Sequence, residues 1–257
     1  MIHGPDWFIH RYDSLPSTMD IASRFAQFGA RERTVVVSTE QTAGRGRGGR
    51  SWQAAAGSAV FTTLILRPPV AGHRLSTLPL IAGVAVAQAI ERITGRTVLL
   101  KWPNDVWLDV DAGYAKVAGI LVTTSLRGDN VDHALVGIGI NVLGRAQDLP
   151  PGATTIHAAT GVAATPIEVL HGVLDRFAEA YAEFVAADGR PSLDAWLARA
   201  ALLGQAVTVE EAGRSRTGTF VGVAEDGGLL IEELGHPIRK VVAGDLVRGP
   251  RRPSVPT

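Results

Sequence analysis

The chain has 257 residues, of which 46% are hydrophobic, and it contains no cysteine. That length allows one large core or a large and a small one, and the lack of cysteine excludes disulfides, thiolate metal sites and cysteine nucleophiles. The formal charge of zero gives no reason to expect nucleic acid or a membrane as the main partner. Residues 1–30 lack the layout of a signal peptide and the apolar segment 78–90 is too short to span a bilayer, so we expect a cytoplasmic protein.

Hydrophobic periodicity and turn residues place the first elements along the chain. Ser17 is expected to cap the first helix, with Asp20 in its first turn and Gly29 at its end. The elements expected next are a strand at 34–39, a glycine-rich loop, a strand at 58–66, a helix at 78–93 ended by Gly95, and strands at 97–100, 106–108, 116–124 and 133–140. Helices precede and follow these hairpin-linked strands instead of alternating with them, which predicts an α+β fold.

The second half of the chain changes character at Gln205. Amphipathic helices are expected over 166–187 and over 192–203, the latter capped by Ser192 and ended by Gly204. After them come short strands at 207–210, 217–223, 229–232 and 238–242, joined by glycine and aspartate turns. This pattern predicts a small β-barrel or meander. The expected division is a domain at 1–204, a small barrel at 205–248 and a disordered, proline-containing tail at 249–257.

An unusual loop follows the strand at 34–39, and it reads Gln41-Thr42-Ala43-Gly44-Arg45-Gly46-Arg47-Gly48-Gly49-Arg50-Ser51-Trp52. Glycines let backbone N–H groups converge on an anion, and arginine forks add positive charge suited to carboxylate and phosphate. Two unit charges 4 Å apart repel by about 1 kcal/mol in water and about 4 kcal/mol at an effective dielectric of 20. A loop of this kind could therefore bring a carboxylate and a triphosphate together.

Simpler interpretations of the loop are a flexible linker or a short RNA-binding tract. It also matches the pattern G-x-G-x-x-G at Gly44, Gly46 and Gly49. A dinucleotide fingerprint needs a helix at its last glycine, whereas here a strand at 58–66 comes next. The P-loop pattern is absent from the sequence, which excludes that class of phosphate site.

Polar residues also gather at the ends of the later strands, in Lys101-Trp102-Pro103-Asn104-Asp105, at Lys116 and at Asn141. Each one alone fits a turn or a solvated strand edge. Together with the cationic loop they could converge on one pocket. The seven histidines are scattered singly, so we expect no zinc site held by the protein.

Four segments carry a family resemblance: the loop at 41–52, Lys101-Trp102-Pro103-Asn104-Asp105, Lys116-Val117-Ala118-Gly119-Ile120-Leu121 and Gly137-Ile138-Gly139-Ile140-Asn141. In order and approximate spacing they resemble the biotin protein ligases, which attach biotin to carboxylases, over residues 10–245. The resemblance implies a mixed-sheet, class II synthetase-like catalytic domain followed by an SH3-like barrel. Because the chain starts close to the catalytic domain, it resembles the ligase-only type that lacks a DNA-binding domain.

The resemblance also assigns roles to single residues. Biotin would contact Ser17, Thr18, Gln41 and Lys116, in a pocket shaped by Gly44, Arg45 and Gly119. Arg47 and Arg50 would cover the ATP phosphates and Trp52 would pack at the far end of the loop, while Lys101, Asn104 and Asp105 would lie on the ATP side and Asn141 near the adenosine. The residues expected to act in catalysis are Lys116, Arg47, Lys101 and Asp105.

Two departures from the family pattern stand out. Met19 occupies the position after Ser-Thr where the family usually has asparagine. The segment 142–152, which should help to cover adenine, has no clear match.

The implied reaction joins biotin to ATP as biotinyl-5′-AMP and then transfers biotin to a lysine of a biotin carboxyl carrier domain of an acyl-CoA carboxylase. Positioning and charge neutralisation would suffice, with Mg²⁺ held mainly by phosphate oxygens and water, and Asp105 as its one candidate protein ligand. The expected partners are biotin, ATP and the carrier domain, without nucleic acid or membrane, and the expected state is a monomer or weak homodimer.

The nearest alternative is a lipoate–protein ligase, which has the same chemistry and a related fold. Those enzymes typically carry an Arg-Arg and a Gly-Gly-Gly run where this chain has Gly48-Gly49-Arg50-Ser51-Trp52, and they lack the proline-bearing Lys101–Asp105 motif. A non-catalytic ligand sensor or an RNA-binding module are alternatives from other classes. Zero net charge and a single short basic tract argue against RNA.

Overall fold

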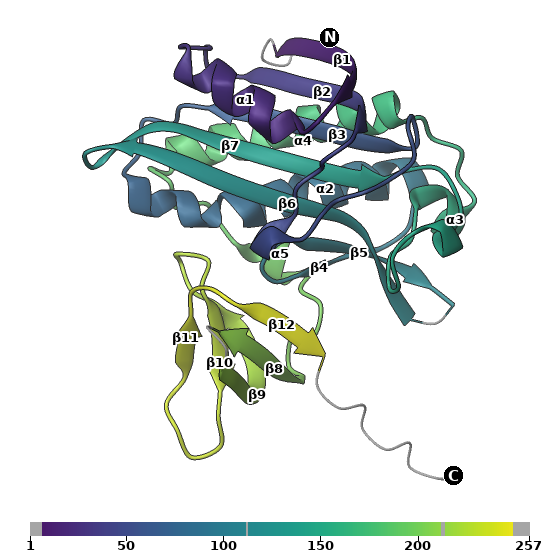
Figure 1. The fold of residues 1–257 in the computed structure, drawn as a ribbon. Coiled ribbons are helices and arrows are strands. Elements are labelled where there is room, and N and C mark those ends of the chain that lie inside the picture. Colours follow the sequence, from purple (N-terminus) through teal and green to yellow (C-terminus); the bar gives the residue numbers. More distant parts are fainter. Residues whose placement is uncertain (1–6, 112, 212–213, 249–257) are drawn as a thin grey trace.

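The computed structural model describes residues 7–111, 113–211 and 214–248. These residues contain two β-sheets and the helices that pack on the larger one (Figure 1). The larger sheet has seven strands in the order β1-β2-β3-β7-β6-β5-β4, and within it only β1 and β2 are parallel neighbours. Its strands are β1 (Phe8–Leu15), β2 (Thr34–Gln41), β3 (Ala59–Leu66), β4 (Val98–Lys101), β5 (Asp105–Val110), β6 (Gly113–Arg127) and β7 (Asn130–Asn141). The predicted α+β class with a mixed sheet is confirmed.

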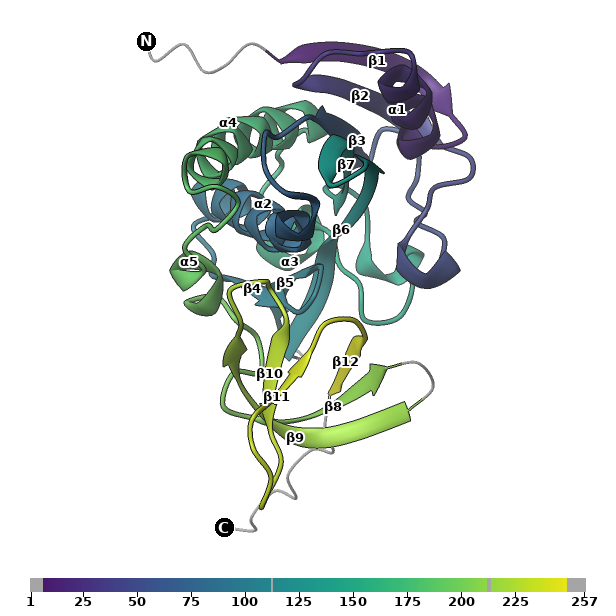
Figure 2. The ribbon, with the colours of Figure 1, turned by 90° about the vertical axis from the view of Figure 1, so that its left-hand side faces the viewer.

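Helices cover both faces of the larger sheet, with α1 on one face and α2 and α4 on the other (Figure 2). The helices are α1 (Thr18–Gln27), α2 (Leu78–Thr94), α3 (Ile156–Thr160), α4 (Pro166–Ala186) and α5 (Asp194–Leu197), with 3-10 turns η1 (Arg47–Gly49), η2 (Gly72–Thr77) and η3 (Ala146–Asp148). The predicted helices at 78–93 and 166–187 are confirmed, since Gly95 ends α2 and Thr165 begins α4 with a capping box.

The two faces of the sheet bury two separate cores because strand side chains alternate. Val35 and Leu64 point to the α2 side, whereas Val36 and Ile65 pack with α1. Residues 72–94 are long and apolar enough to span a membrane, yet 67% of the most apolar 18-residue window within them is buried inside the described part of the chain. Its helix α2 is therefore a core helix, packed between the sheet and α4.

At the sheet edges one expectation was wrong and one strand was missed. The helix expected over 192–203 is reduced to α5, after which the chain runs along edge strand β4: the Leu100 N–H donates to the Arg199 carbonyl at 2.8 Å and the Ala201 N–H donates to the Leu100 carbonyl at 2.8 Å. These bonds satisfy β4 groups that would otherwise be unpaired, and this outweighs helix propensity. Strand β1 at the opposite edge was not expected, because polar residues interrupt its apolar ones without regular alternation and most of the strand is exposed or only partly buried.

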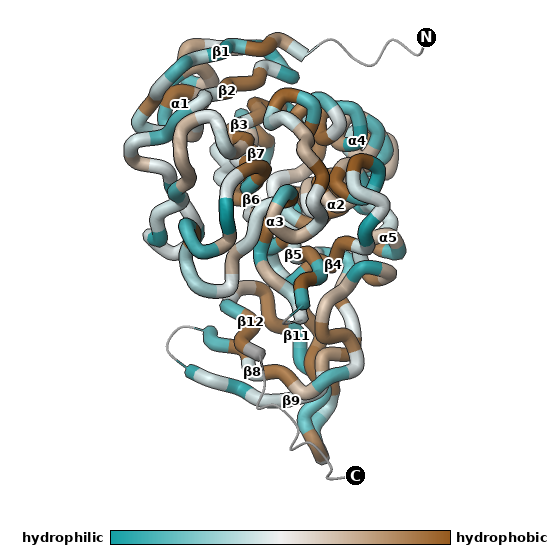
Figure 3. Tube along the Cα trace, turned by 90° about the vertical axis from the view of Figure 1, so that its right-hand side faces the viewer, coloured by the Kyte–Doolittle hydropathy of each residue, from teal (hydrophilic) through white to brown (hydrophobic). Residues whose placement is uncertain are grey.

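The smaller sheet contains β8 (Ala206–Glu211), β9 (Arg214–Val223), β10 (Leu229–Glu232), β11 (Arg239–Val241) and β12 (Asp245–Arg248), in the antiparallel order β11-β10-β9-β8-β12. The expected C-terminal β-domain is confirmed, with β12 as an additional strand; the expected tail at 249–257 lies outside the described residues. Trp102 ties this domain to the larger one, because its buried indole N–H donates to the Gly227 carbonyl at 2.9 Å. Hydrophobic segments gather in the interior, along β3, β7 and α2, whereas β9 at the outer side of the small domain is mostly hydrophilic (Figure 3).

Candidate active site

The glycine-rich loop crosses the larger sheet as a closed strap, the name used below for residues 44–52. The Trp52 N–H donates to the Gly44 carbonyl at 2.9 Å, and the Gly46 N–H donates to the Arg50 carbonyl at 2.7 Å. A Cβ at Gly44 would lie 2.3 Å from the Trp52 carbonyl oxygen, so only glycine fits where the strap closes on itself. The strap is thus a closed turn that lies over the sheet, and not an extended linker.

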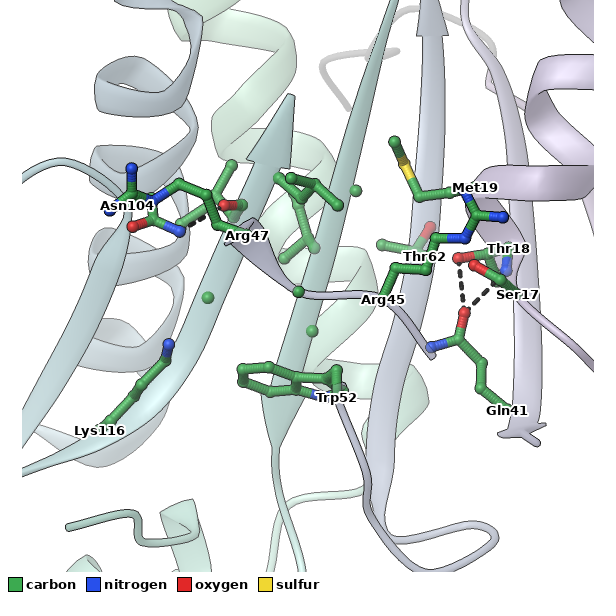
Figure 4. Close-up of a pocket in the computed structure, with 17 residues that line it drawn as sticks. Ser17, Thr18, Met19, Gln41, Arg45, Arg47, Trp52, Thr62, Asn104 and Lys116 are labelled. Carbon is green, nitrogen blue, oxygen red and sulfur yellow. Dashed lines mark hydrogen bonds between the residues drawn. The ribbon is translucent and has the colours of Figure 1, made fainter. Parts of the chain in front are cut away.

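One end of the strap covers a small polar pocket built on α1 and β2. The Gln41 side-chain oxygen accepts from the Thr18 N–H at 2.7 Å and from the Thr18 hydroxyl at 3.1 Å (Figure 4). The buried Thr63 hydroxyl in turn donates to the Thr18 hydroxyl at 2.9 Å. Ser17 stands at the N-cap position, but its side chain does not cap α1 as expected. Its hydroxyl is buried without a hydrogen-bond partner, so it remains available to a ligand.

This first cavity has a volume of about 50 Å³. The residues that line it are Ser17, Thr18, Met19, Gln41, Arg45, Gly46, Arg47, Trp52, Thr62, Asn104, Lys116, Gly119, Ile120, Leu121, Gly137, Ile138 and Gly139. Met19 is buried with its sulfur against Gly137, where a Cβ would lie 2.8 Å from it. The position that departs from the family pattern therefore supplies an apolar wall.

Trp52, at the end of the strap, lies on the sheet. A Cβ at Gly119 or at Gly139 would come within 2.9 Å or 2.5 Å of the indole, so these glycines form a flat seat for the ring. The Lys116 amine lies 5.3 Å from the ring centroid, within cation–π range. Trp52 consequently lines the first cavity and also its neighbour.

The neighbouring second cavity has a volume of about 220 Å³. Its lining residues are Gly46, Arg47, Arg50, Ser51, Trp52, Gln53, Asn104, Asp105, Lys116, Asn141, Pro150, Pro151, Gly152 and Ala153. Asn141 donates through its amide nitrogen to the Thr154 carbonyl at 3.1 Å, while its amide oxygen is buried without a partner. The end of the segment without a family match forms one wall, fixed by a 2.8 Å hydrogen bond from the Lys116 N–H to the Gly152 carbonyl.

Lys116 and Asp105 form an ion pair between the two cavities. The Lys116 amine lies 2.6 Å from an Asp105 carboxylate oxygen, and both side chains are largely enclosed, at 31% and 20% exposure. Asn104 braces this region because its amide nitrogen donates to the Ile120 carbonyl at 2.8 Å. The strands β5 and β6 thus carry one positive and one negative group to the place where the cavities adjoin.

Lys101 is set apart from the other expected site residues. It lines a third, polar space of about 330 Å³ between the two domains, together with Arg50 and Asp105. Burial lowers the pKa of Lys101, and the Asp105 carboxylate opposes that effect. The structure therefore does not bring Lys101 into either of the first two cavities.

The strap is held by two carboxylates, and no local sequence signal indicated that either of them would contact it. Asp20 on α1 pairs with Arg45 at 2.8 Å. Asp245, the first residue of β12, pairs with both Arg47 and Arg50. Asp245 is nearly 200 positions away from these arginines in sequence, a separation of 195 from Arg50, so spacing alone could not reveal it.

Comparison with known proteins places this arrangement in a family. The family model of the Biotin/lipoate A/B protein ligase family matches residues 12–141, and the model of the Biotin protein ligase C terminal domain matches residues 202–249. The chain belongs to the biotin/lipoate A/B protein ligase family. The predicted family is therefore confirmed.

Named relatives and solved structures agree with this assignment. The bifunctional ligase/repressor BirA of Bacillus subtilis is 34% identical over 93% of this chain and 73% of its own length. The biotin–[acetyl-CoA-carboxylase] ligase of Paracoccus denitrificans is 37% identical over 76% of this chain and 82% of its own length. The biotin protein ligase of Aquifex aeolicus in complex with biotin and ATP superposes with a TM-score of 0.77 at 31% identity, covering 94% of this chain and 99% of that one.

Proposed function

We propose that this chain is a biotin–protein ligase that activates biotin with ATP and transfers it to a lysine of a biotin carboxyl carrier domain of an acyl-CoA carboxylase. The supporting observation is that the two adjoining cavities share Gly46, Arg47, Trp52, Asn104 and Lys116. An acid in the first cavity and a nucleotide in the second would meet at these residues. The names of the relatives support biotin and ATP as the two ligands.

The first cavity has hydrogen-bonding groups suited to the cyclic urea of biotin. Such a ring has a carbonyl acceptor and two N–H donors. The free Ser17 hydroxyl and the Gln41 amide can meet these groups, while Met19 and Leu121 offer apolar contact to the rest of the bicycle. The Gln41–Thr18–Thr63 hydrogen bonds fix the amide before the ligand arrives.

The second cavity has an acceptor suited to adenine. The free amide oxygen of Asn141 can accept from an exocyclic amine, which adenine carries at its 6-position and where guanine has a carbonyl. The Pro150–Ala153 wall offers apolar contact to a base. We infer that Asn141 favours ATP over GTP.

In the first step, a carboxylate oxygen of biotin attacks the α-phosphorus of ATP, and the bond from that phosphorus to the pyrophosphate oxygen breaks. Both reactants are anionic, so their approach requires positive charge, which Lys116 and Arg47 provide at the shared residues. No protein nucleophile is needed because the carboxylate is already ionised. In the second step, the lysine amine of the acceptor attacks the acyl carbon and AMP leaves, and Asp105 can accept the proton that the amine loses.

The donor set near the phosphates fits Mg²⁺ bound mainly by ATP. Mg²⁺ is usually held by one or two carboxylates together with substrate phosphates, and Asp105 is the acidic side chain that lines the second cavity. Within the described residues there is no cluster of three or more His, Asp or Glu side chains that could hold a metal. Bound there, Mg²⁺ would neutralise phosphate charge, with Asp105 as its protein ligand.

The proposal extends to partners and location. We place the enzyme in the cytoplasm as a monomer or weak homodimer that has the carrier domain as its protein partner and uses neither nucleic acid nor a membrane. The zero formal charge supports the exclusion of nucleic acid.

Exchange of labelled pyrophosphate into ATP tests the function directly, with biotin, lipoate or no acid added. We expect exchange with biotin only. Exchange with lipoate alone would make the chain a lipoate ligase, and the absence of exchange with either acid would contradict the adenylation chemistry.

A further inference from the structure

The arginines of the strap that face the second cavity are already bound to an anion from the other domain. An Arg47 guanidinium nitrogen donates to the Gly244 carbonyl at 2.7 Å and pairs with the Asp245 carboxylate. Arg50 donates to both oxygens of the same carboxylate, at 3.1 and 3.3 Å. Within the described chain, Asp245 thus receives two guanidinium groups on one carboxylate.

The position of Asp245 is fixed independently of the strap. Strand β12 pairs with β8, and a Cβ at Gly244 would lie 2.6 Å from the Glu210 carbonyl oxygen, so the backbone at Gly244 is tightly seated. The Trp102–Gly227 hydrogen bond anchors the small domain to the larger one at a separate point. Asp245 is therefore held in front of the strap by the fold and does not simply follow the arginines.

The Asp245 carboxylate does not satisfy every hydrogen-bond donor of the two strap arginines. The Nε of Arg47 is buried without a hydrogen-bond partner. Burial, followed by repulsion from Arg50, lowers the pKa of Arg47, so the pair of arginines gains from any stronger anion. A triphosphate carries more charge and more acceptor oxygens than one carboxylate, and so it can displace Asp245 from both guanidinium groups.

We propose that Asp245 is a positioning residue that occupies the phosphate-binding arginines whenever phosphate is absent; this inference rests on the proposed function. In the resting enzyme Asp245 holds the strap over the sheet. ATP displaces Asp245, and the carboxylate returns to Arg47 and Arg50 once pyrophosphate has left. The strap then stays closed over the adenylate until the acceptor lysine arrives.

The proposal makes a distinctive prediction, because one substitution should strengthen the binding of ATP and weaken the retention of the adenylate. In Asp245→Asn, the competing carboxylate is gone, so ATP should bind more tightly by about fivefold, in line with the modest strength of partly exposed ion pairs. The adenylate should dissociate faster by a similar factor, because a neutral amide holds the arginines poorly. A contact that merely joins the domains would instead weaken both ligands when lost.

The experiment measures two quantities on the full chain. The first is calorimetric affinity for inorganic tripolyphosphate and for the α,β-methylene analogue of ATP. The second is the release rate of preformed biotinyl adenylate, in the wild type, Asp245→Asn and Asp245→Glu. Glu179→Gln serves as a control, since Glu179 pairs with Arg176 at 2.8 Å on α4, away from the site.

We expect Asp245→Asn to show tighter binding of both triphosphates and faster adenylate release, with Asp245→Glu restored toward the wild type and Glu179→Gln unchanged. The affinity difference should shrink in 1 M salt because partly exposed charges are screened. Weaker or unchanged triphosphate binding in a folded Asp245→Asn variant overturns the inference. The tripolyphosphate titration contains no biotin, so its result stays separate from a failure of biotin-dependent exchange, which would overturn the proposed function instead.

Discussion

The two ends of the site are built differently. The pocket assigned to biotin is formed by secondary structure, with Thr18 at the start of α1, Gln41 at the end of β2 and Thr63 in β3 joined by hydrogen bonds within the larger domain. The end assigned to phosphate is formed by a turn whose arginines reach a carboxylate of the other domain. One end is held by hydrogen bonds that are buried or part-buried, and the other by partly exposed ion pairs.

This difference bears on how the two ligands are bound. Buried hydrogen bonds on rigid elements favour selectivity for one shape, because a ligand that lacks the matching groups leaves buried polar atoms unpaired. Exposed ion pairs are weak and easily exchanged, which suits a group that must bind a triphosphate and release pyrophosphate in each turnover. The structure thus combines a selective, preformed pocket with an exchangeable anion clamp.

Lys116 joins the two ends, and its removal should have the largest effect. Lys116→Ala should lower biotin-dependent pyrophosphate exchange by about a hundredfold or more, since a preorganised charge next to the reacting groups is worth several kcal/mol. Lys240→Ala is the control, because Lys240 pairs with Asp226 in the smaller domain. Exchange near the wild-type rate in Lys116→Ala would show that the positive charge at the junction comes from the strap alone.

A methyl group at Gly139 should disturb the seat of Trp52. Gly139→Ala would place its Cβ 2.5 Å from the indole and displace the ring, so we expect the KM for biotin to rise by about tenfold, as for other overpacked sites. Gly172→Ala is the matched control, since the nearest atom to its Cβ lies at an ordinary 3.5 Å. If both variants bind biotin equally well, the ring is not seated on Gly139 when biotin binds.

Arg47→Ala should release the strap and leave the Gln41–Thr18–Thr63 hydrogen bonds of the first cavity intact. We expect adenylate to dissociate about tenfold faster, because charge-assisted contacts from the guanidinium are lost, while affinity for biotin alone changes little. Release of labelled adenylate and biotin titration measure the two effects. A large loss of biotin affinity in this variant would mean that the two ends are not independent.

The same comparison separates what the sequence could predict from what it could not. The strap, the Lys101–Asp105 motif and Lys116 are local patterns in which residue type and order carry the chemistry, and most of their side chains do line the two cavities. Helices α2 and α4 also follow from local periodicity and caps, because apolar spacing, Gly95 and Thr165 mark them directly.

The failures have a tertiary cause. The free hydroxyl of Ser17 looks like a cap in the sequence, because only the fold shows that no helix N–H reaches it. The helix expected over 192–203 does not extend past α5, because the following residues pair with β4 instead. That strand becomes an available edge only after the sheet has formed. Asp245 contacts the strap across two domains, and the seat of Trp52 depends on glycines from two strands.

Asn141 provides a smaller test at the nucleotide end. Asn141→Ala should raise the KM for ATP by about threefold to tenfold and narrow its preference over GTP, because a single neutral hydrogen bond is worth about 1 kcal/mol. Kinetics with both nucleotides at saturating biotin measure this. If the preference for ATP stays unchanged, adenine is selected by the Pro150–Ala153 wall and not by the amide.

The smallest expected effect concerns stability. Burial lowers the pKa of Lys101 in the folded state, so the unfolded chain holds its proton more firmly. The charge therefore destabilises the fold below the folded-state pKa, and the penalty disappears as pH rises toward the unfolded value of 10.5. Lys101→Met should raise Tm by about 2 °C at pH 7, a gain that shrinks as pH approaches the unfolded pKa.

Lys240→Met, which removes an exposed lysine, is the control for charge loss alone. Biotin-dependent exchange is measured in the same variant, because Lys101 lines the space between the domains beside Arg50 and Asp105. A lower Tm would show that attraction to Asp105 outweighs desolvation, and Lys101 would then belong with the structural ion pairs. A higher Tm together with reduced pyrophosphate exchange would assign Lys101 to phosphate binding, alongside Arg47 and Arg50.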